Sequence, residues 1–186
     1  MSTPIGKWIA EHRNFERLLE VMEQQLDLFH RGEHPNYELM LDIVYYMTHY
    51  PDCFHHPHED IAFAQMAKYG AVAAVDQSNH QHRVIAKAGK ALQAQLDAVV
   101  TGVMLPWAQV EEPARSYVEY FRRHMRREEH TLFPLARELL TDADWAAIDA
   151  QLPKAVDPLL GGNVEKRYRM LQLQIANELG CDCAIV

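Results

Sequence analysis

The chain has 186 residues, of which 48% are hydrophobic and 24% are charged. At about 150 residues per domain, this length allows one domain with an appendage, and its core is large enough to need no disulfide bonds. The 26 acidic residues outnumber the 18 basic ones and give a net charge of −8. This balance argues against a nucleic-acid-binding protein, which would carry a basic patch.

The sequence contains no stretch close to the roughly 18 to 20 apolar residues of a membrane-spanning helix. The first residues also lack the charged-then-apolar layout of a signal peptide. The three cysteines, Cys53, Cys181 and Cys183, are few and odd in number, which is typical of a reducing compartment. We therefore expect a cytoplasmic protein with neither a membrane nor a nucleic acid as a partner. A metal-binding or redox role for Cys181 and Cys183 stays open.

Helical periodicity dominates the sequence, and strand-like alternation of apolar and polar residues never persists. Amphipathic helices are expected at residues 4–30, 36–68, 71–100 and 113–140. Long helices with short connections predict an all-α fold, an up-down-up-down four-helix bundle. The bundle would occupy residues 1–140.

Prolines predict where two of these helices begin and where one is interrupted. Pro4 and Pro113 are expected to open the first and fourth helices, because proline suits the first helical position. Pro51 and Pro57 lie inside the second helix, where each removes a backbone donor. We therefore expect a kink or short break between residues 50 and 57, with the helix resuming at Pro57.

Residues 141–186 are expected to form a C-terminal helical extension. Thr141 and Asp144 have the spacing of a capping box, which predicts a short helix that ends near Leu152. Asn163 can cap a last helix that ends near Leu179. We expect the extension to pack on the bundle or on a second copy of it, so that the last helix could pair two chains in a homodimer.

The apolar stripe of every predicted bundle helix carries at least one polar residue that can bind a metal ion. These residues are His12 in the first helix, His55 and Glu59 in the second, His82 in the third, and His124 and Glu128 in the fourth. Burying one such group without a partner costs roughly 2–7 kcal/mol. Their presence on all four stripes indicates that a shared partner at the centre of the bundle compensates for their burial.

The spacing within two of the helices supports a shared metal site. His55 and Glu59 are four residues apart, as are His124 and Glu128. Four residues turn a helix by about 400°, so each pair leaves the same face one turn apart. Imidazoles and carboxylates together suit iron, manganese or zinc, and carboxylate-bound di-iron centres are known in bundle cores.

Two positions leave alternatives open. The kink in the second helix could turn His56 inward in place of His55, with Asp60 as the partner of His56; we prefer His55. His80 and His82 lie about 200° apart on the third helix, so only one of them can face the core, and His82 is in phase with the apolar stripe.

Three further residues lie close to these positions in the sequence. Glu129, one position off the stripe, is expected to be solvated or to contact a metal ligand from outside. His58 is expected to face solvent. Gly89 is expected to permit close helix packing.

The segment from His124 to Ala136 resembles the His-x-x-x-Glu-Glu segment of hemerythrin-like, cation-binding HHE proteins. The segment from Phe54 to Phe63 resembles the second such segment, and His12 matches the single histidine of the family's first helix. The resemblance covers about residues 4–160. It implies a four-helix bundle around a non-haem di-iron centre that handles oxygen, nitric oxide or iron-linked redox chemistry.

The sequence also departs from the oxygen-carrying hemerythrins, which use five histidines and two bridging carboxylates. Their third helix carries a His-x-x-x-His pair, whereas Ser78 and Ala86 stand four residues to either side of His82 here. The predicted shell is therefore one ligand poorer. This departure favours the hemerythrin-like proteins linked to nitric-oxide response or iron–sulfur repair over a plain oxygen carrier.

We therefore predict two non-haem iron ions, with manganese or zinc as alternative metals. The predicted ligands are His12, His55, Glu59, His82, His124 and Glu128. Glu59 and Glu128 would bridge the two ions, and the partner would be oxygen, nitric oxide or peroxide. Two alternatives are a di-iron oxidase or peroxidase on the same site and a structural bundle that binds a single zinc ion.

Overall fold

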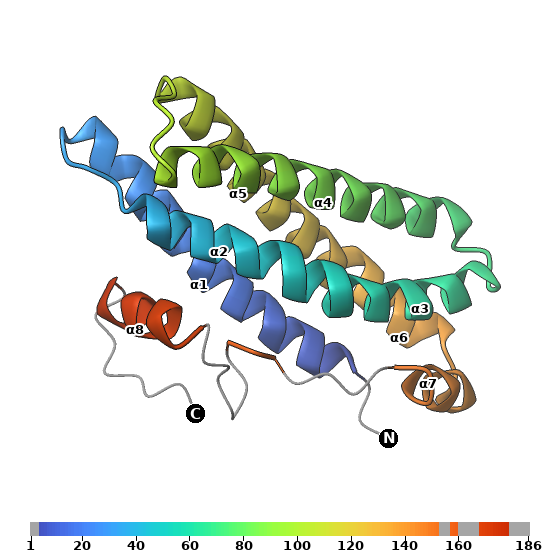
Figure 1. The fold of residues 1–186 in the computed structure, drawn as a ribbon. Helices are drawn as coiled ribbons and strands as arrows, with labels where there is room; N and C mark the ends of the chain where they lie inside the picture. The colour runs from blue at the N-terminus through green and yellow to red at the C-terminus, as the bar shows by residue number, and fades with distance from the viewer. Residues whose placement is uncertain (1–3, 153–156, 160–167, 179–186) are drawn as a thin grey trace.

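Four long, roughly antiparallel helical rods make up the body of the computed structural model, which describes residues 4–152, 157–159 and 168–178. The rods are α1 (Ile5–His30), α2 with α3 (Tyr37–Tyr50 and His56–Ala67), α4 (Val72–Val100), and α5 with α6 (Ala108–Arg127 and Phe133–Leu139). Rods adjacent in sequence pack together, and the last packs back against the first. The predicted all-α four-helix bundle is confirmed (Figure 1).

The expected interruption of the second rod takes the form of a π-helical turn. This turn, η1 (Pro51–His55), joins α2 to α3 without a break in the helical backbone. Pro57 lies two residues beyond it, and a proline ring clashes with the carbonyl of the preceding helical turn. A π turn contains one more residue than an α turn and is therefore wider. The wider turn makes room for the proline ring while the helix continues.

The fourth rod repeats this arrangement but begins earlier than expected. A second π turn, η2 (Glu128–Leu132), joins α5 to α6, and Pro134 again follows it by two residues. The rod begins at Ala108, and Pro113 lies inside α5 rather than at its start. The prediction for Pro113 was therefore wrong. This proline removes one hydrogen bond, to the carbonyl of Gln109, and Gln109 is exposed to water.

Two apolar clusters fill the bundle, one on each side of a polar layer. The first cluster contains Phe15 and Phe121, and the second contains Trp8 and Phe133. His12 lies between them, with ring centroids 6.3 Å from Phe15 and 5.5 Å from Phe133. The polar layer therefore lies across the middle of the hydrophobic core.

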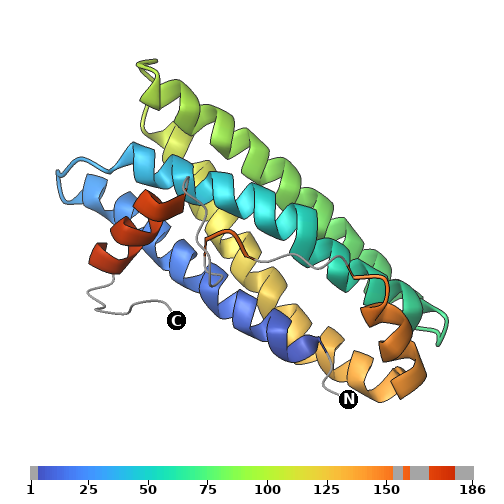
Figure 2. The same cartoon turned by 60° about the horizontal axis from the view of Figure 1, so that its bottom comes forward.

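The described C-terminal segments contact the bundle. Thr141 and Asp144 form the expected capping box at the start of α7 (Asp142–Asp149), which contacts α3. The last helix, α8 (Arg169–Glu178), contacts α1 and α2 (Figure 2), and Leu171 is fully buried in the first apolar cluster.

Several expectations for the C-terminal region stay predictions. They are the division of the chain at residue 140 and the pairing of two chains. The predicted helix start at Asn163 lies outside the described residues, as do Cys181 and Cys183. Within the described chain, none of the helices has both the length and the apolar composition to cross a membrane.

Candidate metal centre

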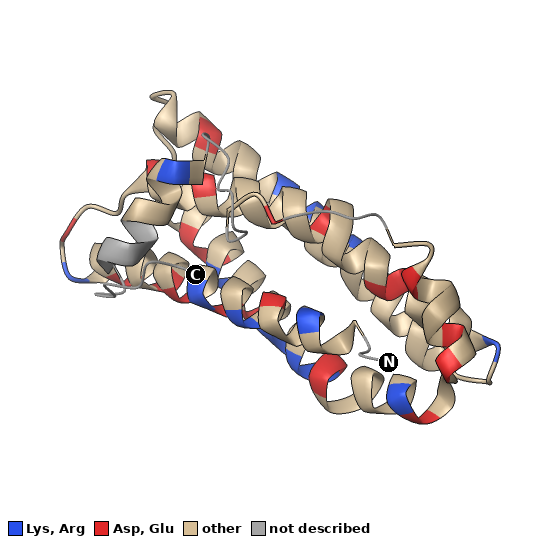
Figure 3. Ribbon diagram, turned by 90° about the horizontal axis from the view of Figure 1, so that it is seen from below, with Lys and Arg blue, Asp and Glu red and all other residues tan. Residues whose placement is uncertain are grey.

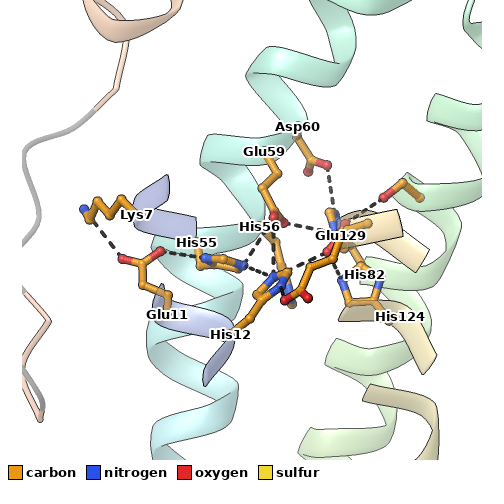
Figure 4. A network of polar contacts seen from close by, with 12 residues as sticks. Lys7, Glu11, His12, His55, His56, Glu59, Asp60, His82, His124 and Glu129 are labelled. Atoms are coloured by element: carbon orange, nitrogen blue, oxygen red, sulfur yellow. Dashed lines mark hydrogen bonds and ion pairs between the residues drawn. The ribbon is translucent and has the colours of Figure 1, made fainter. Parts of the chain in front are cut away.

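The six residues predicted as metal ligands come from all four rods and converge in the polar layer. Figure 4 shows His12, His55, Glu59, His82 and His124 of this set. All six are buried, and the most exposed, His82, has only 6% of its surface accessible. His80, the alternative to His82, is exposed on the outside of α4. The helical phase of the sequence therefore places six polar side chains at one depth in the core.

One group of donor atoms gathers around His12, His55 and Glu59. The Nε2 atoms of His12 and His55 are 3.0 Å apart. Glu59 Oε1 lies 3.7 Å from the first of these atoms and 3.3 Å from the second. Three buried donor atoms from α1, η1 and α3 therefore surround one point.

A second group gathers around His82, His124 and Glu128. Glu128 Oε1 lies 3.2 Å from His82 Nε2, and Glu128 Oε2 lies 3.2 Å from His124 Nε2. The two carboxylates connect the groups, because Glu59 Oε2 lies 3.7 Å from His82 Nε2 and Glu128 Oε2 lies 3.6 Å from His12 Nε2. Each carboxylate thus faces both groups, as a bridging ligand must.

His56 joins the second group. Its ring stacks on that of His82 with centroids 4.2 Å apart and meets the ring of His124 edge-on at 5.4 Å. The sequence posed His55 and His56 as alternatives, whereas the structure turns both inward, one toward each group. His55 ends the π turn and His56 begins α3, and the widened turn lets adjacent residues share the inner face.

The donor set fits metal ions because several of its atoms are buried and have no hydrogen-bond partner among the described residues. These atoms are both carboxylate oxygens of Glu59, Glu128 Oε2, His56 Nε2 and His124 Nε2. Carboxylate oxygens and unprotonated imidazole nitrogens are electron-pair donors. Their convergence in a water-excluded layer is unfavourable unless positive charge offsets it, which a metal ion or protons on neighbouring imidazoles can supply.

Each of the five histidines also has an acceptor group facing its other ring nitrogen, Nδ1; we call these the outer acceptors. The five pairs are His12 with Glu129 (2.9 Å), His55 with Glu11 (2.8 Å), His82 with Asp60 (2.8 Å), His56 with Asp52 (3.2 Å) and His124 with Gln81 (3.4 Å). Four of these are carboxylates, and an ionised carboxylate accepts hydrogen bonds but cannot donate them. The hydrogen-bonded outer acceptors of His12, His55, His82 and His124 favour the tautomer with its proton on Nδ1, which leaves Nε2 free to bind a metal ion; Asp52 faces His56 without a hydrogen bond in the described part of the chain.

Four of the outer acceptors form a closed ring around the bundle. Glu11 on α1 holds His55 of the second rod, and Asp60 on the second rod holds His82 of the third. The remaining two connections, also between neighbouring rods, are Gln81 of α4 to His124 of α5 and Glu129 of η2 back to His12 of α1. Every rod therefore fixes the imidazole of its neighbour.

The pKa values separate the histidines into two kinds. Burial lowers the pKa of His56 well below its usual range and that of His124 to about 4, so both imidazoles are neutral at pH 7. Burial also acts on His55 and His82, but neighbouring carboxylates outweigh it and raise the pKa of each to about 10. Metal binding would therefore have to displace a proton from these two residues.

The outer acceptors were missed in the sequence, apart from Glu129. A signal was present, since Glu11, Asp60, Gln81 and Glu129 each stand next to a predicted ligand in the chain. Asp60 was considered only as a partner of His56 and instead accepts a hydrogen bond from His82.

The expectation for His58 was wrong. Its side chain is 4% exposed rather than facing solvent, and its Nε2 lacks a hydrogen-bond partner. Burial lowers the pKa of this imidazole.

A family model, the hemerythrin HHE cation-binding domain, matches residues 3–136. The match covers more than half of the chain, and the chain therefore belongs to this family of cation-binding bundles. No similar chain was found among curated proteins or among solved structures. The family and the buried His/Glu groups together identify a metal-binding protein.

Proposed function

We propose that this protein holds two iron ions in the polar layer and binds a diatomic ligand or peroxide there. Glu59 and Glu128 would bridge the ions. The terminal ligands would be His12 and His55 on one ion and His56, His82 and His124 on the other. The observation that carries this proposal is the gathering of five buried histidines and two buried carboxylates in one layer, with an acceptor facing Nδ1 of each imidazole.

The unequal ligand count indicates where a small ligand would bind. Two imidazoles and two carboxylate oxygens would supply four donors to the first ion, and three imidazoles with the same carboxylates would supply five to the second. Two adjacent ferrous ions, when bound, supply electrons and open coordination positions for a diatomic ligand. The side of His12 and His55 leaves more positions open and is where we propose that the ligand binds.

The protein's own residues keep this layer dry and its imidazoles fixed. The ring of Phe15 meets His55 edge-on at 5.0 Å, and Phe133 stacks on His12. These aromatic walls exclude water, while Glu11 and Glu129 hold the two imidazoles by Nδ1. A bound diatomic ligand would therefore be protected from protons of bulk water.

The participation of His56 changes the comparison with oxygen carriers. With His56, five imidazoles and two carboxylates gather at the site. The count of ligands therefore no longer favours a nitric-oxide-linked role over an oxygen carrier. We therefore propose oxygen, nitric oxide or peroxide as ligands of one site, without preference among them. The cytoplasmic location expected from the cysteine content stays a prediction.

The decisive experiment is the metal content of the protein purified from an iron-supplemented culture, measured by elemental mass spectrometry. We expect close to two irons per chain. His124→Ala and Glu128→Ala should each lower the iron content, whereas His130→Ala, at an exposed position of the same π turn, should not. One zinc per chain, two manganese ions, or full iron content in both site variants would overturn the di-iron assignment.

Two further measurements separate the alternatives. Exhaustive chelation should lower the melting temperature, because a ligand at 1,000 times its Kd stabilises a fold by about 4 kcal/mol; an unchanged melting temperature would indicate a structural bundle. Spectroscopic titration of the reduced protein with oxygen and nitric oxide should saturate. Steady-state consumption of oxygen or peroxide with a reductant would instead indicate a di-iron oxidase or peroxidase.

A further inference from the structure

A cavity of about 470 Å³ opens beside the metal centre, between α1 and α5. Its walls include three arginines, Arg13, Arg122 and Arg126, and two glutamates, Glu16 and Glu129. The volume falls in the range typical of pockets for organic ligands and far exceeds the space that a diatomic molecule needs. The cavity therefore has the size for a different, larger molecule.

The walls carry three positive and two negative charges, and within the described chain each glutamate is hydrogen-bonded to a residue other than Arg13 and Arg126. Glu16 accepts from Arg122 Nε at 2.7 Å, and Glu129 accepts from His12 Nδ1 at 2.9 Å. Arg122 is held a second time, by Glu23 at 2.9 Å. Arg13 and Arg126 are exposed and have no ion pair within the described chain.

This positive charge is local in a chain of net charge −8. Seen from below, basic and acidic segments alternate along the bundle (Figure 3). Arg122 and Arg126 are one turn apart on the same face of α5, and Glu16 and Glu23 offset the charge of Arg122 but not that of Arg126. Arg13 approaches from α1 on the other side of the cavity. An anion between these side chains would give Arg13 and Arg126 the partner that neither has within the described chain.

We propose that this cavity binds an organic acid anion, a carboxylate or phosphate with a compact apolar part. Guanidinium groups match carboxylate and phosphate oxygens in paired hydrogen bonds. Met125, which is 5% exposed, supplies an apolar wall between the arginines. The lining also includes the hydrogen-bonded pair of Glu129 and His12, so the bound anion would lie beside a proposed metal ligand.

Isothermal titration of the metal-loaded protein with benzoate tests this proposal. Benzyl alcohol serves as the uncharged counterpart, and inorganic phosphate as an anion without an apolar part. We expect one saturable benzoate site per chain that weakens as salt is raised, no saturation with benzyl alcohol, and weaker binding of phosphate. Arg13→Gln combined with Arg126→Gln should raise the Kd for benzoate at least tenfold.

Matched variants identify the site at which benzoate binds. Arg83→Gln removes an exposed arginine from α4, outside the cavity, and should change the Kd less than twofold. His124→Ala, which lowers the metal content, should leave benzoate binding in place. The proposal is overturned if benzoate does not saturate, if the double variant binds it as well as the wild type, or if binding disappears with the metal. The last outcome would show that benzoate coordinates the metal directly, and the metal assay above judges the di-iron proposal separately.

Discussion

Glu11 provides a sharp test of whether the outer acceptors control metal binding. Its carboxylate accepts from His55 Nδ1 at 2.8 Å through one oxygen and from the Tyr50 hydroxyl at 2.7 Å through the other. Glu11→Gln keeps the shape of the side chain but leaves one accepting oxygen and adds an amide donor. Either His55 or Tyr50 then loses its acceptor.

The size of the effect follows from these two hydrogen bonds. A buried donor left without an acceptor costs about 1–3 kcal/mol, so the metal-free variant should unfold more easily by about that amount. Substituting an outer partner of a metal-bound histidine typically weakens metal binding about 10–100-fold. We expect a loss of iron affinity in this range, because the tautomer and orientation of His55 are no longer fixed.

Competition with a chelator of known affinity measures the metal affinity, and thermal melts of the metal-free protein measure its stability. Glu20→Gln is the matched control, since Glu20 is exposed on the same helix. If Glu11→Gln binds iron as tightly as the wild type, the outer acceptors do not tune the site. If the variant loses stability alone, the role of Glu11 is structural.

Three further predictions concern the fold and assembly. At Gly89 a Cβ would lie 2.6 Å from the Cγ2 atom of buried Thr48, so Gly89→Ala should lower the free energy of unfolding by about 1–3 kcal/mol through overpacking. A Cβ at Gly6 would have no atom of the described chain within 4 Å, so Gly6→Ala should not lower stability in the same denaturant titration. Hydrogen bonds from Thr141, Tyr69 and Gln65 lower the pKa of Asp144. The ionised carboxylate therefore stabilises the fold above about pH 4, and the stabilisation is lost as pH falls further. The melting-temperature gap between wild type and Asp144→Asn should shrink below pH 4, and a gap independent of pH would contradict this. Met170, 62% exposed on α8, should lie in the predicted dimer interface, so light scattering should report a dimer that Met170→Asp dissociates; a monomeric wild type would refute the pairing.

The bundle could be predicted from the sequence because its helices are long and their apolar stripes are in phase. The same phase placed His12, His82 and His124 correctly in the buried layer. The apolar stripe of a helix faces the core, so a polar residue in phase with the stripe is buried and one out of phase points to solvent. For these residues, the helical phase alone is enough to predict that the side chain enters the buried layer.

The arrangement around His55 and His56 could not be predicted because the helical period changes there. Counting at 3.6 residues per turn separates neighbouring residues by about 100° and forces a choice between them. The π turn before Pro57 adds a residue and removes that choice. The misplacement of His58 has the same origin, since it lies one residue beyond that proline.

The partners of the outer acceptors could not be predicted from the sequence for a different reason. Each of the four in the ring serves a histidine on another rod, so its role depends on which rods are neighbours. Glu11 lies beside His12 in the chain yet holds His55, and Asp60 lies beside Glu59 yet holds His82. Sequence adjacency to a ligand marked these residues, but only the packing of the rods assigns their partners.

The ring of outer acceptors also explains how a core can tolerate so many polar groups. No pair of rods contains the complete site, because each rod contributes a ligand and also the acceptor that orients the next rod's imidazole. A partly assembled bundle would leave carboxylates and imidazoles buried without partners, which is unfavourable. Polar satisfaction therefore favours one arrangement of the four rods over others that would bury the same apolar surface. In this fold the residues that surround the metal centre also specify which helix packs against which.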